Sequence, residues 1–261
     1  MIITYYCKKG GVGKTTLLGE HVDYLASKGH KTLIISIDDQ NSIFDMFGKY
    51  NEVFNREDNY IEHLLTGAVD QSEALIKIRD NIDAVKTLNI DMISKKLTLE
   101  RQFEKQFIKL IKTLEESYEY VFIDLPPASN RTSEVLFDMC NQIFLIVELN
   151  RLGVNGFYNT LQYFTDADIE LDKIKYIIPN GHSKIKSLPA VALEEMEEIM
   201  KDNLEHATIL DPVPEKSMIQ TLQHKGVVVF DEDVSKLSYY QKTQKKILMD
   251  IFKDLFTPVK L

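Results

Sequence analysis

A glycine-rich segment near the start of the chain constrains the fold more than any other feature. Residues 9–16 read Lys-Gly-Gly-Val-Gly-Lys-Thr-Thr and follow the β-branched and aromatic run at residues 2–6. Glycines allow backbone amides to turn toward a polyphosphate, and a helix that starts there presents its positive end to the same anion. The segment therefore predicts a phosphate-binding loop between a first strand and a first helix.

The polar residues of this loop predict how a polyphosphate would be held. Lys14 is expected to contact the β- and γ-phosphates, and the Thr15 hydroxyl to be a direct ligand of Mg²⁺. Lys8 stands where the general G-x-x-x-x-G-K-[ST] motif has its first glycine. The predicted phosphate-binding residues are Gly10, Gly11, Val12, Gly13, Lys14, Thr15 and Thr16.

Short apolar runs alternate with longer segments of helical period along the chain. The runs predict buried parallel strands at residues 2–6, 32–37, 120–123, 143–147 and 176–178. Helices are expected at residues 15–27, 99–117 and 193–203. The charged stretch 49–91 reads as a variable insertion with short helical fragments. This pattern predicts an α/β fold of the P-loop NTPase type: a doubly wound, mostly parallel sheet with helices on both faces.

Composition and punctuation bear on domain organisation and location. With 261 residues, 44% hydrophobic content and no Pro/Gly/Ser-rich linker, the chain is expected to form a single domain over residues 1–261, without an N-terminal DNA-reading module. Cys7 and Cys140 belong to no CxxC or Cys/His cluster, which argues against a disulfide framework or a metal-cysteine site. No apolar run could cross a bilayer, and the first residues do not resemble a signal peptide. A cytoplasmic location is expected.

The charge balance limits how the chain could meet nucleic acid. There are 31 basic and 40 acidic residues, a formal net charge of -9. Such a balance opposes coating of nucleic acid by the whole surface. Any contact with DNA must therefore be a local patch.

Two carboxylates follow predicted strands directly. Asp38 comes after the second strand, and Asp124 ends the run Tyr-Val-Phe-Ile before Pro126 and Pro127. Ligands of doubly wound sheets bind at the carboxyl ends of the strands. Both carboxylates are therefore expected beside the phosphate loop, although Asp38 could instead cap the next helix.

Together these motifs resemble the ParA/MinD family of deviant Walker A ATPases, whose loop reads K-G-G-x-G-K-[ST]. The resemblance implies ATP and Mg²⁺ as cofactors and a sandwich homodimer in which Lys9 reaches the phosphates of the other subunit. Asp38 would orient the attacking water near Mg²⁺, and Asp124 would hold a Mg²⁺-bound water. Ser36 and Asp39 depart from the family's D-x-D-P-Q-x-[NS] segment, where an Asp and a Pro are usual.

The resemblance extends more weakly toward the C-terminus. Asn180 stands where family members often place an adenine-recognising Asn, and Pro214 resembles the proline segment beside the base. Asn and Pro are also ordinary turn residues, so a purely structural role is equally open for both.

Within the family, the chain is most similar to the short, Soj-like ParA ATPases of plasmid or chromosome partition. That resemblance implies slow in-line hydrolysis of ATP, nonspecific binding of double-stranded DNA by the ATP dimer, a ParB-like centromere-binding partner, and association with the nucleoid. Glu215 replaces the family's basic residue after the proline segment. The DNA-contact candidates are Lys184, Lys186, Lys216, Lys242, Lys245 and Lys246.

Three alternatives stand beside this interpretation. A MinD-like protein would bind membrane through a C-terminal amphipathic helix, but Asp250 and Asp254 oppose the apolar stripe and favour docking on the sheet, so no membrane partner is expected. The stripe comprises Ile247, Leu248, Ile251, Phe252, Leu255 and Phe256. A nitrogenase-type iron protein needs paired interface cysteines, which Cys7 and Cys140 do not supply. A nucleotide-dependent scaffold that has lost hydrolysis through Ser36 and Asp39 is the remaining alternative.

Overall fold

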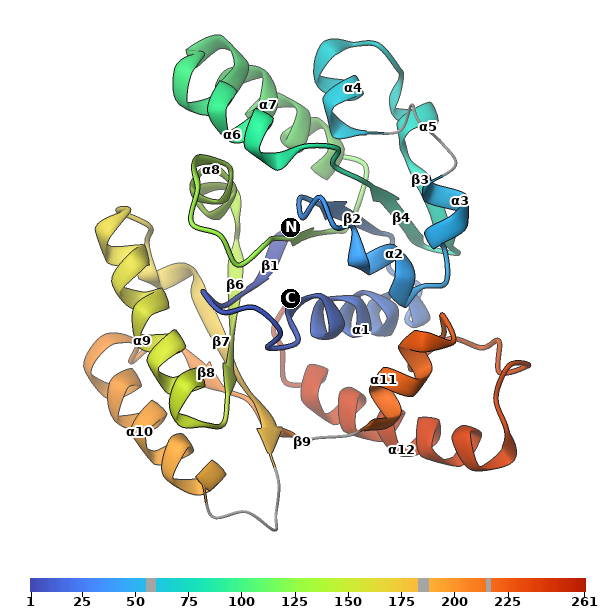
Figure 1. The fold of residues 1–261 in the computed structure, drawn as a ribbon, viewed down its shortest axis with the longest axis vertical. Helices are drawn as coiled ribbons and strands as arrows, with labels where there is room; N and C mark the ends of the chain where they lie inside the picture. The colour runs from blue at the N-terminus through green and yellow to red at the C-terminus, as the bar shows by residue number, and fades with distance from the viewer. Residues whose placement is uncertain (55–59, 183–187, 215–216) are drawn as a thin grey trace.

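The structure, a computed structural model, describes residues 1–54, 60–182, 188–214 and 217–261. A nine-stranded sheet runs through the centre of the described part, in the order β3-β4-β2-β5-β1-β6-β7-β8, and β9 also pairs with β7 (Figure 1). Its edge and end strands are β3 (Ile76–Arg79), β4 (Ile82–Val85), β8 (Thr208–Ile209) and β9 (Val213–Pro214). Every pairing is parallel except that of β3 with β4. The predicted strands are β1 (Ile2–Tyr6), β2 (Thr32–Ser36), β5 (Tyr120–Asp124), β6 (Gln142–Glu148) and β7 (Ile174–His182). The mostly parallel, doubly wound fold is confirmed.

Helices cover both faces of the sheet, as Figure 1 shows. One face carries α1 (Lys14–Ser27), α2 (Ser42–Met46), α11 (Ser217–His224) and α12 (Tyr239–Phe256). The other carries α6 (Ile90–Leu99), α7 (Arg101–Glu115), α8 (Arg131–Met139), α9 (Arg151–Asp166) and α10 (Leu188–Asn203). Alternation along β1 separates the two cores, because Ile3 and Tyr5 pack on the first face and Ile2 and Tyr6 on the second.

Two sequence-based assignments need correction. The stretch 49–91 does contain the short helices α3 (Tyr50–Phe54), α4 (Ile61–Thr66) and α5 (Gln71–Ala74), but it also extends the sheet through β3 (Ile76–Arg79) and β4 (Ile82–Val85). β4 pairs in parallel with β2, so this stretch is part of the core and not an insertion. The helix predicted at 99–117 is interrupted, because Glu100 has an extended backbone between α6 and α7.

The remaining elements lie beside β7, at the edge of the sheet opposite β3. A short 3-10 helix, η1 (Leu171–Lys173), precedes β7. β8 (Thr208–Ile209) and β9 (Val213–Pro214) each add two residues alongside β7. β9 thereby brings Pro214 to the carboxyl end of β7, where Asn180 lies.

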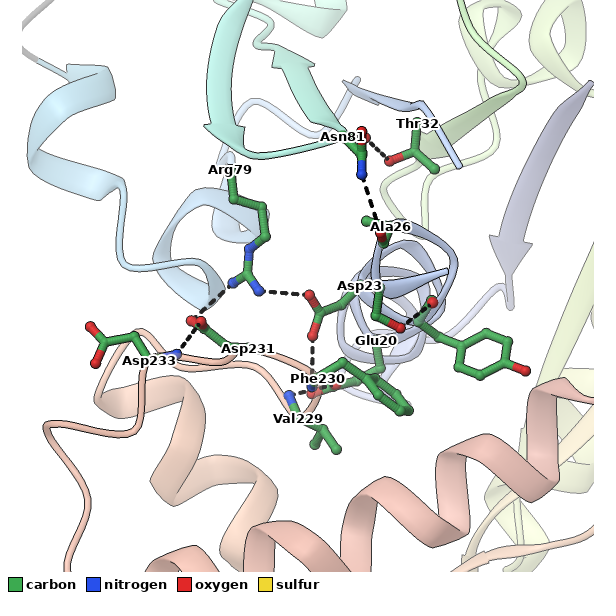
Figure 2. Close-up of polar contacts among 12 residues, drawn as sticks. Glu20, Asp23, Ala26, Thr32, Arg79, Asn81, Val229, Phe230, Asp231 and Asp233 are labelled. Carbon is green, nitrogen blue, oxygen red and sulfur yellow. Dashed lines mark hydrogen bonds and ion pairs between the residues drawn. The ribbon is translucent and has the colours of Figure 1, made fainter. Parts of the chain in front are cut away.

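A charge network fixes the first helix to the rest of the fold (Figure 2). Arg79 of β3 contacts Asp23 of α1 at 2.7 Å and Asp231 at 3.1 Å. The backbone amide of Val229 donates to Glu20, and that of Phe230 donates to Asp23. Because both acids are buried, the pKa of Glu20 is raised well above its ordinary value and that of Asp23 is raised to about 6. These contacts hold the second half of α1, and they thereby fix the position of the whole helix, including its start at the phosphate loop.

The C-terminal helix α12 docks on this same face. Leu248, Phe252, Leu255 and Phe256 are buried, and the Phe256 ring stacks on His21 with centroids 4.4 Å apart. Ile247, also counted in the apolar stripe, is 43% exposed. Among the helices of the described segments, none combines the length and apolar character that crossing a membrane requires.

Candidate functional site

The phosphate loop, residues 9–16, connects β1 to the start of α1 and contains two positions whose backbone conformation requires glycine. Gly11 and Gly13 have φ angles of +74° and +93°, in the left-handed region that glycine adopts without strain. Gly13 is also the N-cap of α1, and no side chain caps the helix there. The first amides of α1 are therefore left for an anion.

Lys14 lies within the turn of the loop. Its side chain is 7% exposed, and its ammonium donates to the Lys9 carbonyl at 3.1 Å. Burial lowers the pKa of Lys14, while Cys7, Asp124 and Asp38 act in the opposite direction. An ammonium at this position is a suitable donor to a phosphate oxygen, with which it would form a charge-assisted hydrogen bond.

Thr15 and Asp124 meet at the carboxyl end of the central strands. The Thr15 hydroxyl lies 3.0 and 3.1 Å from the two carboxylate oxygens of Asp124, which is 1% exposed. Burial raises the pKa of Asp124 to about 7; the Thr15 hydrogen bond and Lys14 oppose this shift, and Asp38 adds to it. A buried carboxylate in this state favours a compensating cation.

This oxygen set fits Mg²⁺ only in the manner of a phosphate-bound ion. Thr15, Asp38 and Asp124 offer the hard oxygens that Mg²⁺ prefers. Over residues 1–54, 60–182, 188–214 and 217–261, however, no group of three or more His, Cys, Asp or Glu side chains could hold a metal. The protein groups would thus hold Mg²⁺ together with phosphate oxygens and water.

The loop after β2 places Asp38 beside Asp124. The amides of Ile37 and Asp38 donate to the Asp124 carbonyl at 2.9 and 3.3 Å. The Asp38 carboxylate accepts from the Gln40 amide at 3.0 Å, whereas the N-cap of α2 is Asn41. Asp38 is therefore not the N-cap of α2.

Lys9 forms an ion pair that the sequence did not suggest. Its ammonium lies 2.5 Å from Glu148 Oε2, with both side chains about one-third exposed. Glu148 ends β6, the neighbour of β1, so the pairing depends on sheet order. The only sequence signal for this contact was that Glu148, a carboxylate, lies at the end of an apolar strand. In this structure Lys9 is satisfied within its own chain.

A cavity of about 590 Å³ adjoins the loop and brings Asn180 and Pro214 together. Asn180 Nδ2 donates to the Val12 carbonyl at 2.8 Å, and its Oδ1 accepts from the Gly181 amide at 2.9 Å. Its amide thus supports the phosphate loop. Helix α11 also lines the cavity, and Gln223 is a lining residue that the sequence reasoning missed.

The predicted DNA contacts divide into three groups. Lys184, Lys186 and Lys216 lie outside the described residues. Lys242 and Lys246 are exposed on α12. The prediction for Lys245 is wrong, because that side chain is 4% exposed and its ammonium donates to the Asp231 carbonyl at 2.5 Å. The helical period turns this lysine toward the core while its neighbours face outward.

Comparison with known sequences places the chain in a family. Residues 1–174 match the AAA domain family. An uncharacterised protein of Methanocaldococcus jannaschii is 25% identical over 90% of this chain and 92% of its own length. The cell division protein PomZ of Myxococcus xanthus is 27% identical over 72% of this chain and 60% of its own. The chromosome-partitioning ATPase Soj of Treponema pallidum is 22% identical over 61% and 62%.

Solved structures agree on the fold. An ATP complex of a Cyanothece McdA variant superimposes with a TM-score of 0.74 and 19% identity, over all of this chain and 97% of the other. A putative plasmid partition protein of Borrelia burgdorferi bound to AMPPNP superimposes with a TM-score of 0.69 and 20% identity, over 97% of this chain and 98% of the other. A chain of the MinC:MinD cell division protein complex of Aquifex aeolicus superimposes with a TM-score of 0.69 and 21% identity, over 95% of each chain.

Proposed function

Because the chain belongs to the AAA domain family and, within it, to the ParA/MinD-type P-loop ATPases, we propose that it is a weak Mg²⁺-dependent ATPase of plasmid or chromosome partition. The observation that supports this proposal most is the convergence of Lys14, Thr15, Asp38 and Asp124 at one end of the sheet. Its cofactors are ATP and Mg²⁺, and residues 1–261 act as a single ATPase domain.

Each residue of this constellation has a distinct task in hydrolysis. Lys14 and the free amides at the start of α1 bind and orient the β- and γ-phosphates. Thr15 and Asp124 position Mg²⁺, which when bound neutralises phosphate charge. Asp38 orients the water that attacks the γ-phosphate. No side chain need be a strong base. Turnover stays slow until a partner completes the site, because a switch that hydrolyses ATP at once cannot hold a signalling state.

Dimerisation is the second part of the proposal. Lys9 leaves Glu148 and contacts the phosphates held by a second copy of the chain, so that the ATP-bound form is a homodimer. The ion pair with Glu148 supplies the alternative partner that keeps Lys9 in place when no second copy is present. ATP binding and association are thereby coupled.

The third part concerns partners. The ATP-bound dimer binds nonspecific double-stranded DNA, and a ParB-like centromere-binding protein stimulates hydrolysis and release. Lys242 and Lys246, exposed on α12, are the remaining described candidates for phosphate contact. The protein is proposed to act in the cytoplasm on the nucleoid.

Hydrolysis is the direct test of the ATPase. Purified protein with Mg²⁺ and ATP, with and without DNA and partner, should release phosphate faster than a Lys14→Ala control. ATP-dependent dimerisation with no phosphate release above that control would instead support the scaffold alternative, for which the Ser36 and Asp39 departures provide a reason.

A binding assay separates partition from membrane cycling. The protein is incubated with nonspecific DNA or anionic liposomes, each with ADP or a slowly hydrolysed ATP analogue. DNA binding that requires the analogue, without liposome binding, supports the partition function. Liposome binding without DNA binding would overturn it in favour of a MinD-like role, which the docking of α12 on the core disfavours.

A further inference from the structure

Helix α11 makes a contact with the phosphate-binding helix that none of the motifs predicts. Gln223 Nε2 donates a hydrogen bond to Thr16 Oγ1 at 2.9 Å, across 207 positions of the sequence. Thr16 is the third residue of α1, and both side chains line the 590 Å³ cavity with Asn180 and Pro214. The C-terminal part of the chain is thereby joined to the phosphate loop.

The direction of this bond determines what the Thr16 hydroxyl can do. A hydroxyl has one proton to donate and two lone pairs to accept with, whereas the Gln223 Nε2 group can only donate. Thr16 therefore accepts from Gln223 and keeps its own proton. Within the described segments no protein acceptor takes that proton. It is available to an acceptor in the cavity.

Neighbouring side chains indicate which phosphate this acceptor belongs to. Thr15 turns toward Asp124, on the metal side of the loop. Thr16 and Gln223 share a second cavity with Thr15, but they also line the 590 Å³ cavity with Asn180 and Pro214, which Thr15 does not line. The two residues proposed to lie beside the base therefore share a cavity with Thr16 and not with Thr15. The phosphate nearest the nucleoside is the α-phosphate, which ATP and ADP share.

Gln223 is held in place by the packing of its helix. Leu222 is 1% exposed, and the Gly226 amide donates to the Gln223 carbonyl at 2.8 Å. Gly226 packs so closely on Gly48 that a Cβ built on it would lie 2.4 Å from the Gly48 Cα. The end of α11 is thus wedged against the turn after α2, which limits the positions open to the Gln223 side chain.

We propose that Gln223 is a positioning residue, which orients the Thr16 hydroxyl to donate to the α-phosphate of the bound nucleotide. The proposal rests on the proposed ATPase function, because it assigns a group to the same nucleotide site. Gln223 acts through Thr16, so its loss should weaken ATP and ADP binding by the same factor. A residue that senses the γ-phosphate would affect ATP alone.

Nucleotide affinity tests this role without reference to turnover. Dissociation constants for ADP and for a slowly hydrolysed ATP analogue are measured by calorimetry for wild type and variants. Gln223→Ala should weaken both by about 3- to 10-fold, the range of a single hydrogen bond. Gln223→Glu should weaken the binding of both nucleotides further. The carboxylate would accept a hydrogen bond from the Thr16 hydroxyl, so that this hydroxyl could no longer donate to a phosphate, and it would add negative charge near the phosphates.

A double-mutant comparison distinguishes positioning from a general structural effect. In a Thr16→Val background the hydroxyl is absent, so adding Gln223→Ala should change affinity by less than about 2-fold. Thr221→Ala is the matched control, because its hydroxyl bonds only to the Ser217 carbonyl of its own helix at 3.1 Å. If Gln223→Ala proves unfolded, Gln223→Met keeps the volume and should show the same loss.

The outcomes are distinguishable. Folded wild type that binds neither nucleotide would overturn the proposed function and this role with it. Wild type that binds, with Gln223→Ala binding equally well, would overturn the positioning role alone. So would an undiminished effect of Gln223→Ala in the Thr16→Val background.

Discussion

Asn180 Nδ2 donates a hydrogen bond to the Val12 carbonyl at 2.8 Å, and the two residues are 168 positions apart. Val12 is 2% exposed, so its carbonyl has little access to water. The sequence left base recognition and a structural role equally open for Asn180, and one of its donors and its acceptor are engaged with backbone. The structure thus gives Asn180 a role in holding the phosphate loop, beside which base contact remains a proposal.

Replacing Asn180 should therefore cost stability as well as affinity. In Asn180→Ala the buried Val12 carbonyl loses its partner, and the free energy of unfolding should fall by about 1–3 kcal/mol. Urea denaturation of the protein without nucleotide measures this effect. Asn203→Ala is the control, because that amide bonds an exposed carbonyl of its own helix. Equal stability of both variants would contradict the bracing role.

The first part of the site could be predicted because each motif follows a strand directly. Parallel strands bring their carboxyl ends to one edge, so the positions of Lys14, Thr15, Asp38 and Asp124 follow from the fold class. The contacts of Lys9 and Thr16 could not be predicted in this way. The partner of Lys9, Glu148, depends on the order of the strands in the sheet, and the partner of Thr16, Gln223, depends on how α11 docks. Neither can be read from the local sequence pattern.

The missed elements have local causes. β4 has only four residues, Ile-Asp-Ala-Val, within a charged stretch. α9 contains Gly153 and Gly156, which lower helix propensity. The structure explains Gly153, because a Cβ there would lie 2.0 Å from the Glu148 carbonyl oxygen. A Cβ on Gly156 would make only an ordinary contact with Lys9 at 3.6 Å, so nothing in the packing requires glycine at that position. Tertiary packing beside the site thus overrides the local signal.

The backbone at Gly13 should not tolerate a side chain. Its φ is +93°, and a Cβ would lie 2.9 Å from Asn180 Nδ2. Gly13→Ala should therefore lower the free energy of unfolding by about 1–3 kcal/mol and weaken nucleotide binding. Gly10→Ala is the control for stability, because a Cβ there meets nothing within 4 Å. Thermal unfolding that shifts equally in both variants would argue against this reason.

The network around Asp23 should make stability depend on pH. Burial raises the folded-state pKa of Asp23 from 3.8 to about 6, against the effect of Arg79. A carboxyl with a raised folded pKa contributes stability that is complete below its unfolded pKa and is lost as pH rises through the folded value. The wild type should therefore lose about 1–3 kcal/mol between pH 4 and 7 from this group.

Asp23→Asn isolates that contribution. The amide stays neutral throughout, so the stability of the variant relative to wild type should improve as pH rises from 4 to 7. Glu20, Asp231, Arg79 and Lys245 face the same group and remain in both proteins. Denaturant unfolding at each pH measures the difference. A difference that does not change with pH would show that Asp23 does not titrate in this range.

Lys9 should be required for association but not for folding. In the proposed dimer its ammonium leaves Glu148 for the phosphates of the second copy, so Lys9→Ala should remain monomeric with a slowly hydrolysed ATP analogue and Mg²⁺. Because Lys14 and the helix amides remain, nucleotide should still bind to each chain. Light scattering with ADP or the analogue measures the mass.

The neighbouring lysine supplies the control for Lys9. The Lys8 ammonium lies over the Tyr163 ring, 5.0 Å from its centroid, and Lys8→Ala removes a charge of the same sign one residue away. The Lys8→Ala variant should dimerise like the wild type, because the proposed contact across the dimer is made by Lys9 and does not depend on the total charge of the loop. A Lys9→Ala protein that dimerises with the analogue as well as Lys8→Ala does would remove Lys9 from the interface, and the pair with Glu148 would then be a structural contact only.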